Sequence, residues 1–505
     1  MAKGRTFYVI KNLKTGVVNQ IVRLGLPFMI RTIILRILGA EYLGLSSLFS
    51  SILQVLNMTE LGFSSAVVFS LYKPIAQKDT DTICALMNFY RKAYTAIGTV
   101  ILIAGSFLFP ILPKLIKGSY PANINIYLLY AIYLVSTSCS YMLFAYKTVL
   151  FSASQRQNVL NNVNSIISVV KFSVQILFLL LFKNYYLYII WNVVFTVAEN
   201  FFVAYLAKKE FPDYFSRGTL QKGKRKEITQ QVKGLAVGKI ANVTRNAFDS
   251  IVLSMYCGLI DVAIYSNYYY LFHAVIGVLG IIIQSINAGL GNSIATESKE
   301  KNYRDFKKFY FYFSWIGSAC TTCFYCLYQP FMKLWAGSEY LASSVTMTLF
   351  CIYFYIIQMG LIRSAYSNAC GIWWECKHIE IFEMLSNLAL NFILGYFWGM
   401  NGILIATIIT VFLFSVMNLT RILLKICFQK NMFEYLRDSL LYAAITIPVV
   451  LFTSRIVQSV PGNTIISFVV QGVACVIISN MIFATIYFCI PVTRSYLMDL
   501  VKKIR

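Results

Sequence analysis

The sequence predicts an all-α, polytopic membrane protein of about fourteen transmembrane helices. First, 58% of the 505 residues are hydrophobic and 13% are charged, whereas an average soluble domain has about 25% charged residues. Second, apolar runs of about twenty residues recur along the chain, which is the length a helix needs to cross a hydrocarbon core about 30 Å thick. Third, the positive charges fall almost entirely on alternate connections between these runs.

Six spans are predicted in the first part of the chain. Each is a mostly apolar run between charged or turn-forming segments, and residues 126–146 contain no charged side chain at all. The first run is too long for a cleavable signal peptide and is interrupted by Arg23, Arg31 and Arg36. In order, the predicted spans are 17–38, 44–72, 93–112, 124–149, 161–182 and 187–207.

A basic connection follows, with Lys222, Lys224, Arg225 and Lys226 close together. These charges favour a cytoplasmic linker attracted to anionic lipid headgroups, and the less favoured alternative is a segment that binds phosphates or nucleic acid. The net charge of +24 does not indicate a nucleic-acid partner, because the basic residues lie beside hydrophobic segments instead of forming one continuous face.

Eight spans are predicted after this linker. The run 465–488 is again free of charged residues. The predicted organisation is an N-terminal lobe at 1–207, the linker at 208–234, a C-terminal lobe at 235–424, and two additional spans with a cytoplasmic tail at 425–505. The spans are 235–257, 263–295, 309–329, 344–369, 379–398, 402–424, 439–457 and 464–490.

The number of spans is even, so both termini are expected on the same side of the membrane. With the termini in the cytoplasm, most of the 44 Lys and Arg residues lie on the inner side, as the positive-inside rule requires. Only five lie on the outer side: Lys114, Lys117, Lys183, Lys333 and Arg455.

The two lobes contain an internal repeat. Residues 114–119 (KLIKGS) match 333–338 (KLWAGS) at an offset of 219 residues, and Gly39 and Gly258 share this offset. Two six-helix lobes that are related by pseudo-symmetry and enclose a central cavity are therefore predicted, since transporters often bind substrate between repeated bundles.

Charged residues inside spans are candidate site residues, because a charge that faces lipid costs several kcal/mol. Arg23 and Arg31 can address one cavity at two depths of the first span, and Lys171 and Arg363 can extend the polar path. The seventh span carries a polar stripe within roughly 120° of arc, which consists of Lys239, Asn242, Arg245, Asn246 and Asp249.

The stripe has two interpretations. Arg245 and Asp249 are one turn apart and can form an internal ion pair that only supports packing. Alternatively, the cations bind a phosphate-bearing substrate, and Asp249 modulates their charge or carries a coupling proton. Glu60 in the second span is a second candidate for a coupling ion, H⁺ or Na⁺. For Lys171 and Arg363, helix pairing or headgroup contact is at least as well supported as substrate contact.

Enzyme chemistry has little support in the sequence. The chain has two histidines, no recognisable phosphate-cradling loop and no serine with a base partner. Cys320, Cys323 and Cys326 resemble part of an iron–sulfur signature but lack the fourth ligand at the expected spacing, so packing of small thiols is the favoured reading. No catalytic residue, metal or cofactor is predicted. An integral-membrane polysaccharide polymerase stays a weaker alternative.

Several segments together resemble the Wzx-type polysaccharide flippases of the multidrug, oligosaccharidyl-lipid and polysaccharide exporter superfamily. The resemblance spans nearly the whole chain. It rests on the order and spacing of 60–66 (ELGFSSA), 70–76 (SLYKPIA), 249–254 (DSIVLS), 264–268 (IYSNY), 330–331 (PF), 337–340 (GSEY), and Glu383 with Asn387.

This resemblance implies a fourteen-helix transporter in the bacterial cell membrane. It would move undecaprenyl-diphosphate-linked oligosaccharide from the cytoplasmic to the outer leaflet by alternating access, for export of capsular or O-antigen-type polysaccharide. An ion gradient would supply energy, and a polysaccharide polymerase and glycosyltransferases are possible partners. The alternatives are a flippase for peptidoglycan precursors and a multidrug exporter of the same fold, for which intramembrane carboxylates that bind cationic compounds are expected.

Overall fold

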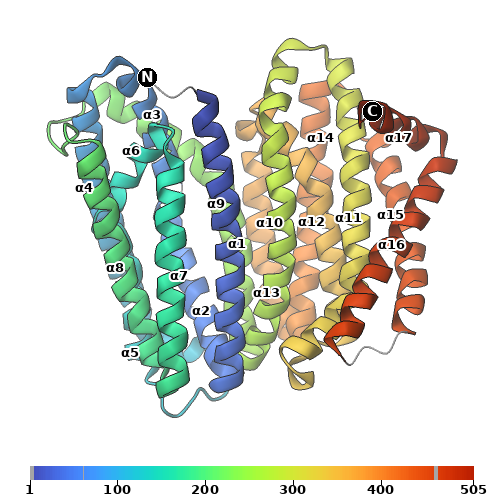
Figure 1. Ribbon diagram of the computed structural model, residues 1–505, viewed down its shortest axis with the longest axis horizontal. Coiled ribbons are helices and arrows are strands. Elements are labelled where there is room, and N and C mark those ends of the chain that lie inside the picture. Colours follow the sequence, from blue (N-terminus) through green and yellow to red (C-terminus); the bar gives the residue numbers. More distant parts are fainter. Residues whose placement is uncertain (1–4, 61, 460–463, 505) are drawn as a thin grey trace. The chain divides into compact units, whose positions relative to one another are not determined.

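The computed structural model describes residues 5–60, 62–459 and 464–504. The described residues form helices and connections without any β-strand, so the predicted all-α class is confirmed. The chain forms two compact units, Met1–Ala263 and Ile264–Arg505. Figure 1 colours the first from blue to green and the second from yellow-green to red.

The first unit is built around long helices that pack side by side. α1 packs along α7, α7 packs against α8, and α5 contacts both α4 and α8, while α9 packs against α2 and α3. The elements are α1 (Arg5–Ile37), α2 (Ala40–Leu56), η1 (Asn57–Glu60), α3 (Phe63–Gln77), α4 (Thr80–Ser106), η2 (Phe109–Leu115), α5 (Ile126–Met142), η3 (Ala145–Lys147), α6 (Thr148–Ala153), α7 (Gln157–Phe182), α8 (Tyr185–Glu210) and α9 (Lys222–Tyr256).

The second unit has α11 at its centre, in contact with α12, α15 and α16. Three ion pairs fix one end of α11: Lys307 to Glu434 at 3.2 Å and to Asp438 at 3.5 Å, and Lys308 to Asp499 at 2.5 Å. The elements are α10 (Leu259–Thr296, which starts in the first unit), α11 (Lys299–Trp335), η4 (Ser338–Tyr340), α12 (Ser344–Cys370), α13 (Trp373–Thr410), the π-helix η5 (Val411–Leu419), α14 (Thr420–Leu423), the π-helix η6 (Leu424–Phe428), α15 (Phe433–Gln458), α16 (Ile465–Cys489) and α17 (Pro491–Ile504).

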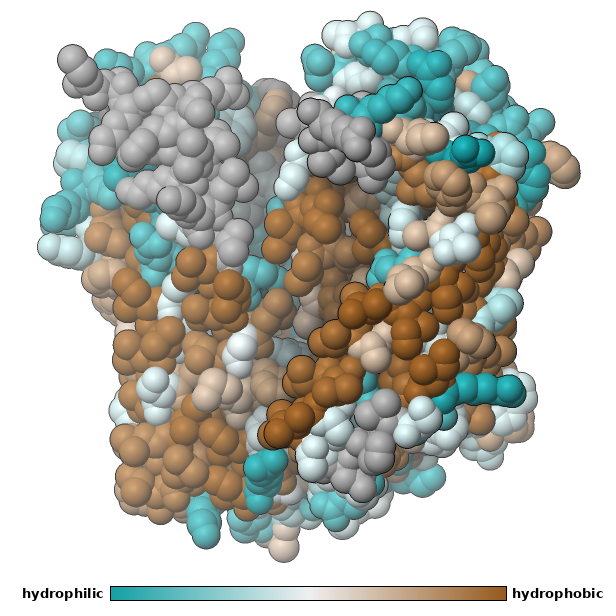
Figure 2. All heavy atoms as spheres, turned by 45° about the vertical axis from the view of Figure 1, so that its right-hand side comes forward, coloured by the Kyte–Doolittle hydropathy of each residue, from teal (hydrophilic) through white to brown (hydrophobic). Residues whose placement is uncertain are grey.

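Each of the predicted spans overlaps one or more of these helices. Within the described residues, eight helical segments are long and apolar enough to cross a membrane, or ten if two bent pairs each count as one span. Figure 2 shows hydrophobic side chains in a band across the second unit, with hydrophilic residues gathered at its two ends. This distribution is the one expected for a surface in contact with lipid.

Several predicted spans differ from simple helices. The predicted span 44–72 is broken into α2, η1 and α3, and Gly62 at the start of α3 adopts a left-handed φ of 89°. The predicted spans 379–398 and 402–424 share the long helix α13 and the helical turns after it, with a kink at Gly399 (φ 54°). Glycine permits both backbone conformations because it lacks a Cβ atom.

The internal repeat is visible in the backbone itself. Gly39 and Gly258 have φ angles of 108° and 98°. The amide nitrogens of Leu38 and Gly39 both donate to the carbonyl of Ile34, and those of Cys257 and Gly258 both donate to the carbonyl of Leu253, which follows Ile34 by the same 219 residues. Gly118 and Gly337, in the KLIKGS and KLWAGS segments, also share positive φ angles of 83° and 102°. The two copies therefore end and turn their helices in the same way.

The boundary between the two compact units follows Ala263, which is later in the chain than the predicted linker. Within 208–234, only 211–221 is a connection, because α8 extends to Glu210 and α9 begins at Lys222. The repeat pairs α9 with α1, yet α9 packs against α2 and α3 and belongs to the first unit. The polar stripe predicted on the seventh span therefore lies in the same unit as the first span.

Candidate functional site

The polar stripe lies on α9, which runs as one helix from Lys222 to Tyr256. Asp249 is buried, with 1% of its surface exposed, and Arg245 and Asn246 are half-buried. The backbones of Lys239 and Asn242 belong to the same helix, but their side chains lie outside the described residues. A buried carboxylate flanked by half-buried polar groups is the environment in which an intramembrane charge is kept away from lipid.

Glu60 lies at the end of η1, a segment that contacts both α4 and α9. The hydroxyl of Tyr94 in α4 donates a hydrogen bond of 2.8 Å to Glu60 Oε1. On the α9 side, the hydroxyl of Thr244 lies 3.7 Å from the sulfur of Met58 in η1. The tertiary structure thus brings the segment that carries Glu60 into contact with the helix that carries Arg245 and Asp249.

The two arginines of the first span differ in exposure. Arg23 is exposed and Arg31 is half-buried. The guanidinium of Arg31 is close enough to Tyr188 in α8 for an electrostatic interaction. Arg31 therefore faces protein at this depth, whereas Arg23 lies on the surface of the unit.

Lys171 has partners on the neighbouring helix. Its ammonium group donates to Asn192 Oδ1 in α8 at 3.3 Å and also interacts electrostatically with Glu199. It lies 4.9 Å from the centre of the Phe172 ring. These contacts correspond to the helix-pairing interpretation of Lys171, and a role in substrate binding stays a prediction.

Arg363 belongs to the second unit, where it interacts electrostatically with Glu380 and Glu383 of α13. Glu383 is 6% exposed and accepts a hydrogen bond of 3.1 Å from Ser415. This position therefore contains both charge signs, which differs from a purely cationic site.

A buried polar ladder continues along α13 from Glu383. Asn387 donates to the hydroxyls of Thr407 and Thr410, each at 3.2 Å, and Asn391 donates to Asn387 Oδ1 at 3.3 Å. The residues of this ladder are not among the site residues predicted from the sequence. The sequence feature that indicates the ladder is the four-residue spacing of 383, 387 and 391, which places three polar side chains on one face of a helix.

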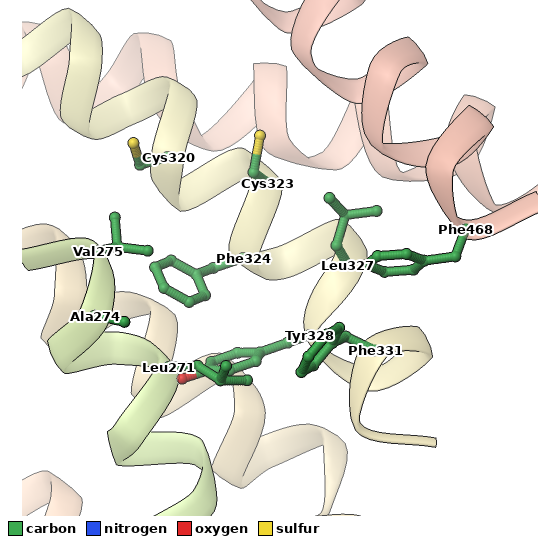
Figure 3. A pocket seen from close by; sticks show the side chains of 10 residues that line it. All are labelled: Leu271, Ala274, Val275, Cys320, Cys323, Phe324, Leu327, Tyr328, Phe331 and Phe468. Atoms are coloured by element: carbon green, nitrogen blue, oxygen red, sulfur yellow. The ribbon is translucent and has the colours of Figure 1, made fainter. Parts of the chain in front are cut away.

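An apolar pocket of about 290 Å³ lies between α10, α11 and α16 of the second unit. In Figure 3, Phe324 and Tyr328 point from α11 towards Leu271 and Val275 of α10, and Phe468 of α16 lies beside Leu327. Its remaining lining residues are Ala274, Cys320, Cys323 and Phe331. A pocket with this lining can hold a hydrocarbon segment but offers little to a charged group.

The cysteines of the predicted C-x-x-C-x-x-C pattern pack in this region. Cys326 and Cys475 are buried in a cluster with Val457, and the sulfur atoms of Cys323 and Cys475 are 3.8 Å apart. Within the part of the chain that the structure describes, no three His, Cys, Asp or Glu residues are placed to hold a metal ion.

Long apolar helices in two units, with charged and amide groups buried among them, define a polytopic membrane protein. Solved structures support this class. The fold resembles that of the lipid II flippase MurJ in an inward closed conformation, with a TM-score of 0.68, 15% identity, and coverage of 96% of this chain and 99% of that one.

Multidrug transporters share the fold as well. An inward-facing multidrug resistance MATE family transporter of the MOP superfamily matches with a TM-score of 0.63 and 14% identity, over 81% of this chain and 99% of its own. A Vibrio cholerae MATE transporter matches with a TM-score of 0.55 and 12% identity, over 83% of this chain and 98% of its own.

Residues 9–287 match the family described as polysaccharide biosynthesis protein. The chain belongs to this family, which confirms the relationship to the exporter superfamily inferred from the sequence segments. It is therefore a multi-pass membrane protein of this family, with a fold that it shares with a lipid flippase and with multidrug transporters. No curated protein matches the chain.

Proposed function

We propose that this protein is a flippase that carries undecaprenyl-diphosphate-linked oligosaccharide from the cytoplasmic to the outer leaflet of the bacterial cell membrane. The observation that carries the proposal is the set of cations retained within the helices of the first unit. Arg31 and Arg245 are half-buried there. A guanidinium can replace part of the hydration that a diphosphate loses when it leaves water, and its fork geometry matches phosphate oxygens.

The lipid tail has different requirements from the headgroup. A polyprenyl chain needs an apolar surface, and the pocket lined by Leu271, Phe324 and Phe468 supplies one of about 290 Å³. This volume accommodates only part of such a chain, so the rest would lie in the bilayer. Export would proceed by alternating access, in which the polar site opens to each side of the membrane in turn.

An ion gradient is the proposed energy source. Asp249 and Glu60 are the proposed coupling groups in the first unit, and Glu383 with its amide ladder is a third candidate in the second unit, because it is a buried carboxylate with a hydrogen-bond donor. One charge that moves through 100 mV releases about 2.3 kcal/mol, enough to bias the return of an empty carrier. In the proposed orientation both termini are cytoplasmic, and a polymerase and glycosyltransferases are proposed partners.

The test is deletion of the gene followed by analysis of lipid-linked glycans. If the proposal holds, undecaprenyl-linked oligosaccharide accumulates and stays inaccessible to a membrane-impermeant glycan-modifying reagent added outside. The wild-type gene restores access.

Each alternative predicts another outcome. Accumulation of peptidoglycan precursor alone would indicate a flippase for that lipid. Unchanged lipids with increased sensitivity to cationic compounds would indicate a drug exporter. Externally accessible but unpolymerised repeat units would indicate a polymerase. Any of the three outcomes would overturn the proposed cargo.

A further inference from the structure

We propose that the first unit carries a binding site for the phosphate group of an anionic phospholipid, at the end where α4, η3 and α8 meet the connection 211–221. The site is separate from the stripe on α9 and from the proposed coupling residues. Its proposed ligand is a lipid held by the protein, independent of the cargo that is moved.

The site is a partly enclosed cavity of about 310 Å³. Arg91 comes from α4, Lys147 from η3 and Lys208 from the last turn of α8, so three helical segments each contribute one cation. The start of the connection also lines the cavity, with Phe211 and Tyr214. A phosphate group fits easily in this volume, and a cation from each of the three segments can approach it.

The cations are not neutralised by carboxylates in the described part of the chain. None of the residues that line the cavity is acidic, and no described carboxylate lies within ion-pair distance of Arg91, Lys147 or Lys208. Glu210, two residues after Lys208, is paired with Arg156 at 2.5 Å. The nearest acid on α8 is therefore already engaged with another cation.

Lys147 and Lys208 also repel each other. They are close enough for their charges to interact, and Lys147 is half-buried. Like charges held together in a partly desolvated hollow are unfavourable unless an anion lies between them. Arg91 adds a third positive charge and is oriented by a hydrogen bond of 3.3 Å to Asn88 Oδ1.

The wall of the cavity is held in place by aromatic packing. Phe211 stacks with Tyr214 at a ring distance of 5.8 Å and contacts Phe151 edge-on at 5.3 Å. The Phe211 amide continues the hydrogen bonding of α8 by donating to the Ala207 carbonyl at 2.9 Å. The cavity is thus a built feature of the fold, with its shape set before a ligand arrives.

The surface next to the cavity favours a lipid over free phosphate. Phe201 is 54% exposed and Tyr205 is 61% exposed on α8, which is one of the helices suited to cross a membrane. Phe201 and Lys208 are seven residues apart and so lie on nearly the same face of the helix. Phe215, at the mouth of the cavity, is 55% exposed. Acyl chains along α8 would therefore bring a lipid headgroup to the cations.

The experiment measures lipid retained by the purified full-length protein in detergent, using native mass spectrometry with added phosphatidylglycerol or phosphatidylcholine. We expect the wild-type protein to retain phosphatidylglycerol preferentially. The double variant Lys147→Gln/Lys208→Gln should bind phosphatidylglycerol at least about tenfold more weakly. Each lysine near an anionic headgroup adds to the attraction, and the variant removes two of them. Arg91→Gln, at an exposed position, should weaken binding by a smaller factor and serves as a second variant.

Lys209→Gln is the matched control, because it removes a neighbouring exposed charge on α8 that does not line the cavity. Equal retention of phosphatidylglycerol by the double variant and by this control would overturn the site. Inorganic phosphate provides the other arm. If phosphate at millimolar concentration binds with the same dependence on Lys147 and Lys208 while phosphatidylglycerol does not bind, the lipid assignment is overturned in favour of free phosphate.

Discussion

Tyr94 of α4 donates a hydrogen bond of 2.8 Å to the carboxylate of Glu60, across the break that separates α2 from α3. Tyr90 packs against Tyr94 with ring centres 4.2 Å apart. The break in the helix therefore places a carboxylate against an aromatic cluster instead of lipid. This relationship connects a backbone irregularity with one of the three carboxylates proposed to couple transport to an ion gradient.

Replacing Tyr94 with Phe removes this hydrogen bond while the ring stays in place. We expect the variant to be less stable by about 1 to 3 kcal/mol, because the half-buried carboxylate loses a donor. Thermal unfolding of the purified protein in detergent measures the effect. Tyr72→Phe is the control, since Tyr72 is exposed. An equal unfolding temperature for both variants would show that the bond contributes nothing to stability.

Arg31→Ala and Arg245→Ala test the proposed phosphate-binding cations. Each variant should reduce glycan export about tenfold or more, because a charge-assisted hydrogen bond to phosphate contributes about 1.5 to 3 kcal/mol. Export is measured as surface polysaccharide in a deletion strain that expresses the variant at wild-type membrane levels. Arg36→Ala, at an exposed position of the same first span, should leave export unchanged. Full export by both test variants would remove these arginines from the proposed site.

Asp249→Asn tests whether the buried carboxylate carries a proton. The amide has almost the same size but cannot change its charge, so the variant should lose the dependence of transport on external pH. The measurement is a pH profile of glycan translocation in proteoliposomes. Asp213→Asn, in the exposed connection after α8, is the control and should retain the wild-type profile. A wild-type profile for Asp249→Asn would argue against proton transfer at this position.

Gly44 in α2 lies directly against the start of α10. A Cβ atom at this position would be 2.1 Å from the carbonyl oxygen of Leu259, so the backbone would have to move. We expect Gly44→Ala to destabilise the protein by about 1 to 3 kcal/mol, as overpacking usually does. Gly25→Ala in α1, where nothing lies within 4 Å, should be neutral or slightly stabilising. The unfolding temperatures of Gly44→Ala and Gly25→Ala in detergent measure this difference, and equal values would contradict the expected overpacking at Gly44.

Asp79 caps the first turn of α4 by accepting a hydrogen bond of 3.0 Å from the amide of Thr82. Hydrogen bonds from the side chain and backbone of Thr82 lower the pKa of Asp79 below its ordinary value. Its contribution to helix stability is therefore complete above the ordinary pKa of an aspartate and is lost as the pH falls through the lowered value.

Amide hydrogen exchange in residues 80–83 should report this cap. We expect Asp79→Ala to exchange faster in this turn at neutral pH, whereas Asp79→Asn, which keeps an acceptor, should exchange at nearly the wild-type rate. The wild-type protein should lose part of this protection as the pH falls through the lowered pKa of Asp79. Protection that is the same in all three proteins would contradict a capping role.

The positions of the helices and the repeat followed from the sequence. Apolar runs long enough to cross a bilayer mark the helices, because unpaired backbone groups are too costly in lipid for other structures. The offset between Gly39 and Gly258 was visible in the sequence, and both glycines have positive φ angles, of 108° and 98°, in the structure. Local chemistry of this kind needs no knowledge of neighbouring helices.

Periodicity identifies the polar face of a helix but not the helix that it meets. The sequence by itself determined an all-helical membrane protein with charged residues inside its predicted spans and a family relationship to polysaccharide biosynthesis proteins. Only the tertiary structure decided that Lys171 meets Asn192, that Arg363 lies near enough to Glu383 for an electrostatic interaction, and that α9 packs with the first unit. These pairings depend on contacts between residues far apart in the chain, which are selected by side-chain packing and the desolvation of charges once the helices assemble.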